Sequence, residues 1–284
     1  MASNAETGLT RLLRTALSFV LALIITILGM SICANTCILN SNNIENRFIS
    51  YEYTNAVRDD ILSYTKSEYV KNGLDYSNVD SIITYDEVNQ VVSAYTGYYI
   101  SNRVGYDENL YLTEIDGIVT QIKSDISQQL AVPDRSSNSD AENAMSASIA
   151  DYFADIVSIT GVDELSTVLN VGIPATYVAI GVSAFFFIFI TLILAYLGEK
   201  RYRSFRAISI SFLTSGVFEI CLAVIVYIIS QVKKLDIYPT YFGDQVFSYI
   251  KLCISWVVMF GLATILISLA VSVFTWRSKV KGKR

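Results

Sequence analysis

The 284-residue sequence contains no histidine, and only 17% of its residues are charged. Without histidine the chain cannot build Ser-His or Cys-His catalytic pairs, histidine-liganded zinc or haem sites, or a histidine pH switch. A soluble domain carries about one quarter charged residues, whereas 52% of the residues here are hydrophobic. These shortages exclude many enzyme classes and indicate a membrane protein.

Four apolar stretches are long enough to cross a bilayer, which takes about 20 residues of helix. They cover residues 15–39, 173–197, 207–231 and 246–276. In lipid the backbone has to satisfy its own hydrogen bonds, so we expect each stretch to be helical. The predicted fold is all-α and integral to the membrane: four transmembrane helices, with an extracytoplasmic helical-bundle domain (residues 40–172) inserted between the first and the second.

Basic residues gather in residues 1–14, 198–206 and 277–284, which together hold 11 basic and two acidic residues. Residues 40–172 hold 7 basic and 21 acidic residues, and the short loop 232–245 is balanced. Because basic loops stay on the cytoplasmic side, we expect both termini and the turn 198–206 in the cytoplasm. Residues 40–172 and the loop 232–245 then lie outside the plasma membrane.

The first span has a second interpretation, as a cleaved signal peptide. It follows Arg11 and Arg14, and Ile32-Cys33-Ala34 loosely resembles a cleavage site. Its apolar run is longer than that of a usual signal peptide. We therefore favour a retained anchor and leave cleavage open.

The segment between the first two spans shows helical periodicity. Capping boxes that pair Thr84 with Glu87 and Ser139 with Glu142, and a weaker one that pairs Thr113 with Asp116, mark helix starts. We expect outer helices over residues 42–70, 84–104, 113–131 and 140–158, and a short fifth that runs from Asp163 into the second span. Residues 105–109 and 133–138 are predicted turns.

The outer segment also lacks cysteine, since none lies between Ser41 and Asn170, and it contains no Asn-x-Ser/Thr sequon. Small extracellular domains of animal proteins often depend on disulfides. Their absence favours a bacterial envelope protein over a eukaryotic surface protein.

Glu219 lies near the middle of the third span, where a carboxylate is costly unless it is protonated, paired or hydrated. Ser211, Ser215 and Glu219 recur at four-residue spacing and share one helical face, so we expect this stripe to face the other helices. Glu219 is either a proton or cation site or a conformational latch, or it is a neutral group that hydrogen-bonds a neighbouring helix. The second interpretation is favoured because the acid is isolated. Lys251 in the fourth span is expected to extend to the outer interface rather than toward Glu219.

Small residues recur at four-residue spacing on three spans and mark faces where helices can approach closely. They are Ser18 and Ala22, Ala175, Ala179 and Ser183, and Ser268 and Ser272. We expect these faces to pack within one chain rather than to form a dimer.

The chain has four cysteines, none of which is expected to form a disulfide or a metal site. Cys33 and Cys37 lie one helical turn apart, a separation with poor geometry for a disulfide within a helix. Cys221 and Cys253 lie inside spans. Buried apolar thiols are the predicted state of all four.

No motif for chemistry stands out: we find no nucleotide-binding loop, no nucleophile paired with a base and no nucleic-acid patch. We therefore predict that the protein is not an enzyme, and we assign no catalytic, cofactor-binding or metal-binding residue. Glu219, Ser215 and Ser211 form the candidate intramembrane polar site. The expected partners are the lipid bilayer and an envelope or membrane protein, and the oligomeric state stays open.

The whole-chain pattern resembles a loosely defined group of uncharacterised four-span membrane proteins of Gram-positive, Firmicutes-type bacteria. The matching parts are Ser50-Tyr51-Glu52-Tyr53 with Val57, residues 83–92 and 112–118, and the basic turn 201–206 that leads into residues 208–216. These motifs are diffuse. The group has no known activity, so the resemblance implies an architecture and no function.

A second resemblance concerns topology alone. FtsX and MacB-type permease subunits also have cytoplasmic termini, four spans and a large outer domain after the first span. In this sequence the turn 198–206 is very short and leaves little room for the coupling helix that those proteins place against an ATPase. We treat the likeness as an analogy.

Two functional hypotheses follow. The leading one is a structural, sensing or accessory membrane protein whose outer helical domain contacts an envelope partner or ligand. The alternative is a transport-related subunit, either a transmission permease coupled to an ATPase or a protein that uses Glu219 for ion or proton coupling.

Overall fold

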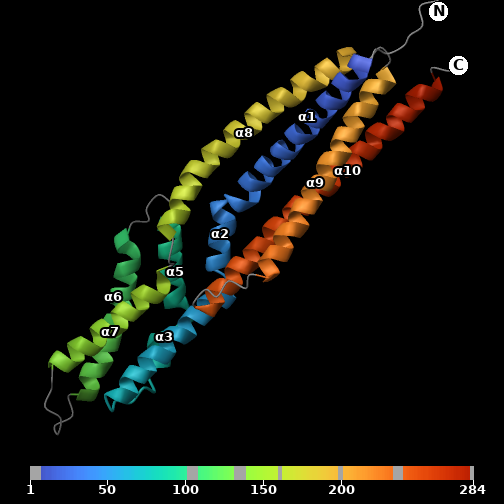
Figure 1. Ribbon diagram of the computed structural model, residues 1–284. Helices are drawn as coiled ribbons and strands as arrows, with labels where there is room; N and C mark the ends of the chain where they lie inside the picture. The colour runs from blue at the N-terminus through green and yellow to red at the C-terminus, as the bar shows by residue number, and fades with distance from the viewer. Residues whose placement is uncertain are drawn as a thin grey trace, which may run out of the picture. The chain divides into compact units, whose positions relative to one another are not determined.

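A computed structural model describes residues 8–100, 108–130, 139–158, 162–197, 201–232 and 239–281 (Figure 1). Within these ranges the chain is helical and has no strand, which confirms the predicted all-α class for the described residues. The elements are α1 (Gly8–Cys33), η1 (Ala34–Ile38, one turn of π-helix), α2 (Ser41–Phe48), α3 (Tyr51–Lys71), α4 (Val79–Ile82), α5 (Tyr85–Tyr99), α6 (Glu108–Leu130), α7 (Ser139–Val157), α8 (Val162–Leu197), α9 (Arg201–Val232) and α10 (Thr240–Lys281).

The chain divides into two compact units. The first, which we call the span unit, comprises Met1–Asn40, Asn170–Asp236 and Val246–Arg284. The second, which we call the bundle unit, comprises Ser41–Leu169 and Ile237–Gln245. Most of residues 40–172 fall in the bundle unit. It also takes in part of the segment that the sequence analysis treated as the separate loop 232–245.

Four helical stretches are long and apolar enough to cross a membrane, and each contains one of the predicted spans. They are Thr10–Phe48, Thr167–Leu197, Tyr202–Gln231 and Thr240–Arg277. All four extend beyond the predicted limits at one or both ends. A helix continues through polar residues that flank an apolar run, so hydropathy marks the middle of such a helix better than its ends. The predicted helix from Asp163 into the second span is confirmed, because α8 begins at Val162 and continues to Leu197.

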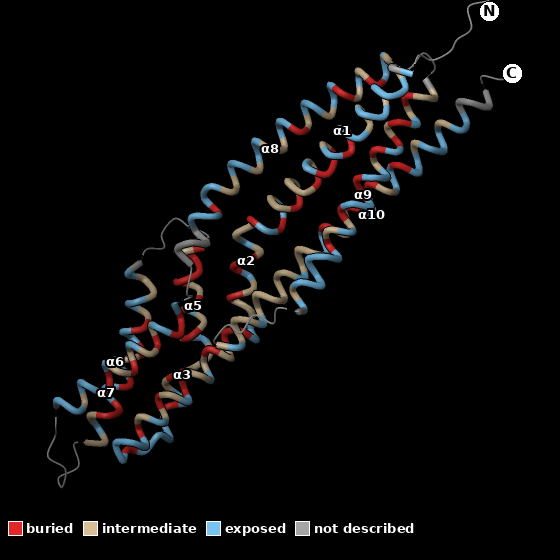
Figure 2. Tube along the Cα trace, in the orientation of Figure 1, coloured by how far each residue is buried: buried red, intermediate tan, exposed pale blue. Residues whose placement is uncertain are grey.

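Buried and exposed positions alternate along the helices of the span unit (Figure 2). Several of the buried side chains in this unit are polar, and many of the exposed ones are large and apolar. Its buried residues include Thr26, Ser183, Ser204, Ser209, Ser211, Ser215, Glu219, Thr264 and Ser268. Large apolar side chains lie outside, such as Phe185 at 64% exposure and Leu266 at 65%. A unit folded in water hides such groups, whereas lipid solvates them. The burial pattern therefore suits a membrane-embedded unit, independently of helix length.

Helices α1 and α9 run side by side in the span unit (Figure 1). Leu21 and Ile25 of α1 pack with Ile190 and Leu194 of α8 and with Ala207 of α9. A second cluster joins α1, α9 and α10 through Cys33, Ala223 and Val257. Helix α1 thus contacts each of the other three helices of this unit.

The bundle unit packs α3, α5, α6 and α7 around an apolar core. Val57, Ile61, Val88, Val91, Ile122, Ile149 and Phe153 have no exposed surface. These residues recur at helical spacing, so the apolar periodicity of the segment coincides with the buried faces of these helices. Pairs of tyrosines add to the packing, and the Tyr64 and Tyr152 rings stack with their centroids 3.8 Å apart.

Two of the three predicted helix starts are resolved by the described residues. The capping box at Thr84 is confirmed: the Glu87 backbone N–H donates to Thr84 Oγ1 (3.3 Å), and the Thr84 N–H donates to the Glu87 carboxylate (3.0 Å). The box at Thr113 is wrong. Helix α6 begins earlier, at Glu108, and Thr113 donates to the Asn109 carbonyl from within the helix (2.8 Å). A threonine three residues before an acid also occurs inside helices, where its hydroxyl bonds the preceding turn.

The predicted helix 42–70 is two helices, α2 and α3. Ser50 separates them as the N-cap of α3, and its hydroxyl accepts from the Tyr53 backbone N–H (3.4 Å). The side chain of Ser139 lies outside the described residues, as do the predicted turn 133–138 and most of the turn 105–109.

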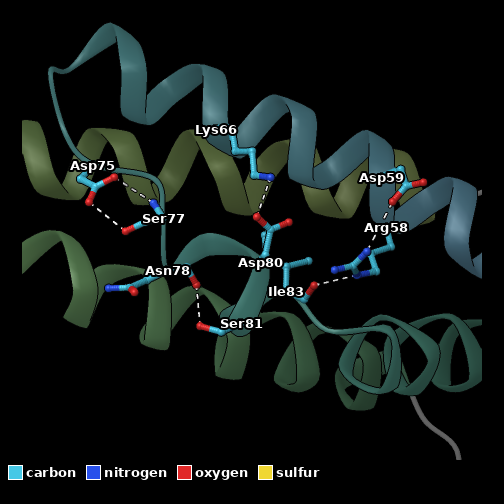
Figure 3. Close-up of polar contacts among 9 residues, drawn as sticks. All are labelled: Arg58, Asp59, Lys66, Asp75, Ser77, Asn78, Asp80, Ser81 and Ile83. Atoms are coloured by element: carbon cyan, nitrogen blue, oxygen red, sulfur yellow. Dashed lines mark hydrogen bonds and ion pairs between the residues drawn. The ribbon is translucent and has the colours of Figure 1, made fainter.

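A glycine and a few polar contacts fix the connection from α3 through α4 (Figure 3). Gly73 has a φ of 67°, and Leu74 N–H donates to the Tyr69 carbonyl (2.9 Å), a Schellman helix end. Lys66 of α3 forms an ion pair with Asp80 of α4 (2.7 Å), and Arg58 Nε donates to the Ile83 carbonyl (2.9 Å). The chain therefore turns back along α3 before α5 begins.

Asp125 of α6 hydrogen-bonds residues at the end of α3 and in the loop between α3 and α4. It accepts from the Tyr69 hydroxyl (3.2 Å), from Asn78 Nδ2 (3.1 Å) and from Gln129 Nε2 (2.8 Å). Gln129 also pairs with the backbone of Asp75 in both directions. Burial, together with the neighbouring Asp125 carboxyl, raises the pKa of the Tyr69 hydroxyl. The bundle unit thus combines an apolar core with one satisfied polar network.

Candidate functional site

The predicted polar stripe lies on the inner face of α9. Ser211, Ser215 and Glu219 are each 1% exposed. Their four-residue spacing places them on one side of the helix, and that side faces α1. The prediction that the stripe faces other helices is confirmed.

Hydroxyl groups connect this stripe to α1. Ser18 and Ser211 lie 2.9 Å apart through their hydroxyls, and Ser211 Oγ donates to the Ser18 carbonyl (2.7 Å). One level deeper, Thr26 Oγ1 and Ser215 Oγ are 2.9 Å apart. Residue numbers rise together along both helices, so α1 and α9 are parallel neighbours.

The Glu219 carboxyl lies at the deep end of the stripe. Ser215 Oγ donates to its Oε1 (3.1 Å), whereas Oε2 has no hydrogen-bond partner among the described residues. Thr264 of α10 lies beside the carboxyl, but its hydroxyl donates to the Gly261 carbonyl (2.8 Å). A buried carboxyl with one unsatisfied oxygen is stable only when it is protonated or when a cation or water joins it.

Glycines on three helices mark close helix contacts around Glu219. A Cβ at Gly29 of α1 would lie 2.7 Å from Glu219 Oε1 and would collide with the Phe260 ring. A Cβ at Gly216 would lie 2.6 Å from the Gly261 carbonyl, and one at Gly261 would lie 3.0 Å from the Gly216 carbonyl. The carboxyl is therefore enclosed where α1, α9 and α10 approach most closely.

A second hydroxyl cluster joins α9 to α10. Ser209 Oγ lies 3.1 Å from Ser268 Oγ and 2.6 Å from Ser272 Oγ, and Ser268 Oγ also donates to the Ser209 carbonyl (2.7 Å). The sequence analysis marked Ser268 and Ser272 as a close-packing face, and their contact with α9 agrees with that prediction. Of the face predicted on the second span, Ser183 is buried but Ala175 is exposed.

Lys251 does not reach the candidate site. Its Nζ lies over the Phe247 ring, 4.3 Å from the centroid, one turn earlier on α10. The prediction that Lys251 turns away from Glu219 agrees with this contact. Lys251 therefore does not neutralise the Glu219 carboxyl.

The prediction of four buried thiols is confirmed for Cys33 and Cys37 and is wrong for Cys221, which is exposed, and for Cys253, which is partly exposed. Cys37, at the π-helical turn η1, has its Sγ 3.3 Å from Cys253 Sγ of α10, and both thiols are free. Cys33 instead approaches the Trp256 carbonyl (3.9 Å). The Tyr249 hydroxyl donates to the Cys37 carbonyl, which also accepts from the Asn40 backbone N–H (3.4 Å). Nothing in the sequence of either helix alone indicates this pair.

Several members of the site were not predicted: Thr26, Thr264 and the three glycines. Their positions are visible in the sequence, but which helices meet there is not. Among the described residues no three His, Cys, Asp or Glu side chains gather closely enough to hold a metal ion. The arrangement can hold or release one proton, or it can lock three helices together.

Comparison with known proteins adds no family to this picture. No protein-family model, curated protein or solved structure matches the chain.

Proposed function

We propose that the protein is a non-enzymatic, four-span plasma-membrane protein whose bundle unit lies outside the cytoplasm and binds a partner there. The observation that supports this is the division of the chain into two units with opposite surfaces. The span unit exposes large apolar side chains, and the bundle unit hides them in its own core. Such a chain holds a water-compatible domain at a membrane.

Charge supports the orientation. Segments 1–14, 198–206 and 277–284 are strongly basic, and residues 40–172 carry three times as many acidic as basic residues. This is the bias that retains basic segments in the cytoplasm. We propose that both termini are cytoplasmic and that the protein belongs to a bacterial envelope.

Helix α7 offers the clearest docking surface on the bundle unit. It carries Asp140, Glu142, Asp151 and Asp155 and no lysine or arginine. Asp140, Asp151 and Asp155 are exposed, and at 100° per residue they fall within about 60° of one another around the helix. Ile149 and Phe153 occupy the buried side. The chemistry that fits this face is a basic protein segment.

Purification of the full-length tagged protein in a mild detergent tests this proposal. We expect one membrane or cell-wall protein to co-purify in stoichiometric amount. A triple variant, Asp140→Asn, Asp151→Asn and Asp155→Asn, should lose it. The matched control replaces three exposed acids elsewhere on the unit, Glu52→Gln, Asp59→Asn and Asp116→Asn, and should retain it.

Two results contradict the proposal. Retention of the partner by the α7 variant would show that this face does not bind it. A stoichiometric ATPase in the wild-type preparation would favour the transmission-permease alternative instead.

A second candidate function rests on Glu219. Its enclosed carboxyl has one oxygen without a partner among the described residues, which is the arrangement expected of a group that holds a proton while enclosed and gives it up when the helices separate and water enters. The close glycine contacts favour the opposite view, in which Glu219 locks α1, α9 and α10 in one arrangement. We rank the lock ahead of ion or proton coupling because Glu219 is buried against Gly29 of α1 and because α9 and α10 leave no room for a side chain at Gly216 or Gly261.

Glu219→Gln separates these roles, because glutamine has nearly the same shape but cannot exchange a proton. If Glu219 only locks the helices, the variant should express and keep its partner as the wild type does. Loss of the co-purifying partner, with normal expression and an unchanged midpoint of thermal unfolding, would establish a proton or ion role.

A further inference from the structure

A cavity of about 610 Å³ lies between α1 and α9, and the Glu219 site does not use it. Arg11 and Arg14 of α1 and Arg203 and Arg206 of α9 line it. Among the described residues that line it, none is acidic. Four arginines from two helices thus line one hollow in the span unit.

The cavity changes from basic to apolar along its length. On α1 its lining passes from Arg11 and Arg14 to Phe19 and Ala22, and on α9 it passes from Arg203 and Arg206 to Ile210. Because α1 and α9 are parallel, as the contacts of Ser18 with Ser211 and of Thr26 with Ser215 show, the four arginines lie at the same end. The eleven helical steps from Arg11 to Ala22 cover roughly 16 Å, about half the hydrocarbon thickness of a bilayer.

A basic end with an apolar continuation fits an amphipathic anion. Guanidinium groups bind phosphate oxygens in pairs. Basic pockets between membrane helices on the cytoplasmic side are suited to anionic lipid headgroups. Arginines that served only as an orientation signal would not need to converge from two helices on one hollow.

We infer that this cavity binds the headgroup phosphate of an anionic phospholipid, with the start of an acyl chain along Phe19, Ala22 and Ile210. The four arginines supply the charge, and the Tyr202 hydroxyl, which accepts from Arg203 Nε (3.4 Å), lies at the same end. A free phosphate ion shares the headgroup chemistry but gains nothing from the apolar half of the cavity. The site is independent of the partner proposed for the bundle unit.

Native mass spectrometry of the full-length protein in detergent tests the inference, with phosphatidylglycerol and phosphatidylcholine as probes. The wild type should retain phosphatidylglycerol over phosphatidylcholine. Arg14→Gln with Arg206→Gln should lower phosphatidylglycerol retention on the order of tenfold. The control pair Lys251→Gln with Arg277→Gln removes the same charge from exposed positions that do not line the cavity, and it should retain the lipid as the wild type does.

Competition with inorganic phosphate distinguishes a phospholipid headgroup from a soluble phosphate compound as the ligand. At millimolar concentration it should neither bind measurably nor displace phosphatidylglycerol. Displacement of the lipid by phosphate would overturn the lipid and make a soluble phosphate compound the ligand. Equal retention by the Arg14/Arg206 variant, or equal retention of the two lipids by the wild type, would overturn the site itself.

The inference remains testable if the double variant does not fold. The wild type alone should show the preference for phosphatidylglycerol, and that preference should weaken as salt concentration rises, because exposed charges are screened. A preference for phosphatidylcholine, or an affinity unaffected by salt, would contradict binding through the arginines.

Discussion

The two units of this chain bury apolar and polar residues in different proportions, with a larger polar share in the span unit. In the bundle unit the fully buried side chains include Ile61, Ile122 and Phe153, while in the span unit they include Ser211, Ser215 and Glu219. Water drives large apolar groups together in the first case. Lipid offers no such drive, so span helices are held by close backbone approach and by hydroxyl contacts.

The stability of the bundle unit is therefore expected to depend mainly on buried apolar volume, and that of the span unit on close packing between helices. The bundle unit tolerates a change at its surface and suffers from any loss of core volume. The span unit tolerates the loss of an outward apolar side chain and suffers from any gain of volume between its helices. Matched substitutions in the two units turn this difference into measurable predictions.

The largest effect is expected for Phe153→Ala in the bundle unit. Phe153 has no exposed surface, and the truncation of a buried phenylalanine costs about 3–5 kcal/mol of unfolding free energy. Hydrogen–deuterium exchange on the full chain in detergent should show faster exchange in α3 and α6. Thiol labelling should report separately on the span unit, because all four cysteines lie in it.

The control for this prediction is Phe185→Ala in the span unit. Phe185 is 64% exposed, and loss of an outward side chain should change stability by less than about 0.5 kcal/mol. If Phe185→Ala were as damaging as Phe153→Ala, Phe185 would have to be buried by another protein or by a second copy, and the contrast between the units would fail.

The next effect is expected for Gly216→Ala in the span unit. The new Cβ would lie 2.5 Å from Thr264 Oγ1 and 2.6 Å from the Gly261 carbonyl, which is backbone and cannot move aside cheaply. We expect a loss of about 2 kcal/mol from overpacking. Unfolding by dodecyl sulfate, followed through the fluorescence of Trp256 and Trp276, measures the span unit because both tryptophans lie in it.

Gly181→Ala on α8 is the matched control, since a Cβ there meets nothing within 4 Å. It should leave the unfolding curve unchanged or raise its midpoint slightly, because alanine favours helix more than glycine does. Equal losses for the two variants would mean that the contact between Gly216 and Gly261 is not what holds α9 to α10.

The sequence predicted patterns within a helix better than contacts between helices. The stripe of Ser211, Ser215 and Glu219 followed from the helical period alone, and so did the buried faces of α5, α6 and α7. The partners Thr26 and Gly29 did not follow. Which residues of two helices meet depends on the register of their packing, and a single sequence contains no measure of it.

The same limit explains the cysteines and the helix boundaries. Cys33 and Cys37 are neighbours in sequence, yet Cys37 meets Cys253, more than two hundred residues away. Ser50 separates α2 from α3 inside what is one continuous periodic pattern. The Ser50 hydroxyl caps α3 and so ends the preceding helix. The apolar period continues on both sides of Ser50, so the period alone does not reveal the break.

A smaller effect is expected for Tyr69→Phe, which removes one hydrogen bond to Asp125 in the bundle unit. The cost near neutral pH should be about 1 kcal/mol. Because burial raises the pKa of Tyr69 in the folded chain, an unfolded tyrosine gives up its proton first, near pH 10. The stability contributed by Tyr69 is therefore present below about pH 10 and is lost as pH rises above it.

Urea unfolding at pH 8 and at pH 11, monitored by hydrogen exchange in α6, checks this sign. The wild type should lose more stability between the two values than Tyr69→Phe does. Tyr76→Phe, at an exposed position of the same unit, should lose as much as the wild type. An equal pH response in wild type and Tyr69→Phe would show that the Asp125 network does not set the alkaline limit of the bundle unit.

The smallest effect is expected for Ser209→Ala, which removes the hydroxyl between α9 and α10. Ser209 Oγ contacts both Ser268 and Ser272, but hydrogen bonds between membrane helices contribute on average only about 0.6 kcal/mol. The matched control is Ser230→Ala, whose hydroxyl bonds only the Tyr227 carbonyl of its own helix in the described structure. Tryptophan fluorescence during dodecyl sulfate unfolding measures both. A loss for Ser209→Ala that exceeds the loss for Gly216→Ala would reverse the order of the two forces in the span unit: hydroxyl pairing, rather than close backbone approach, would then hold α9 against α10.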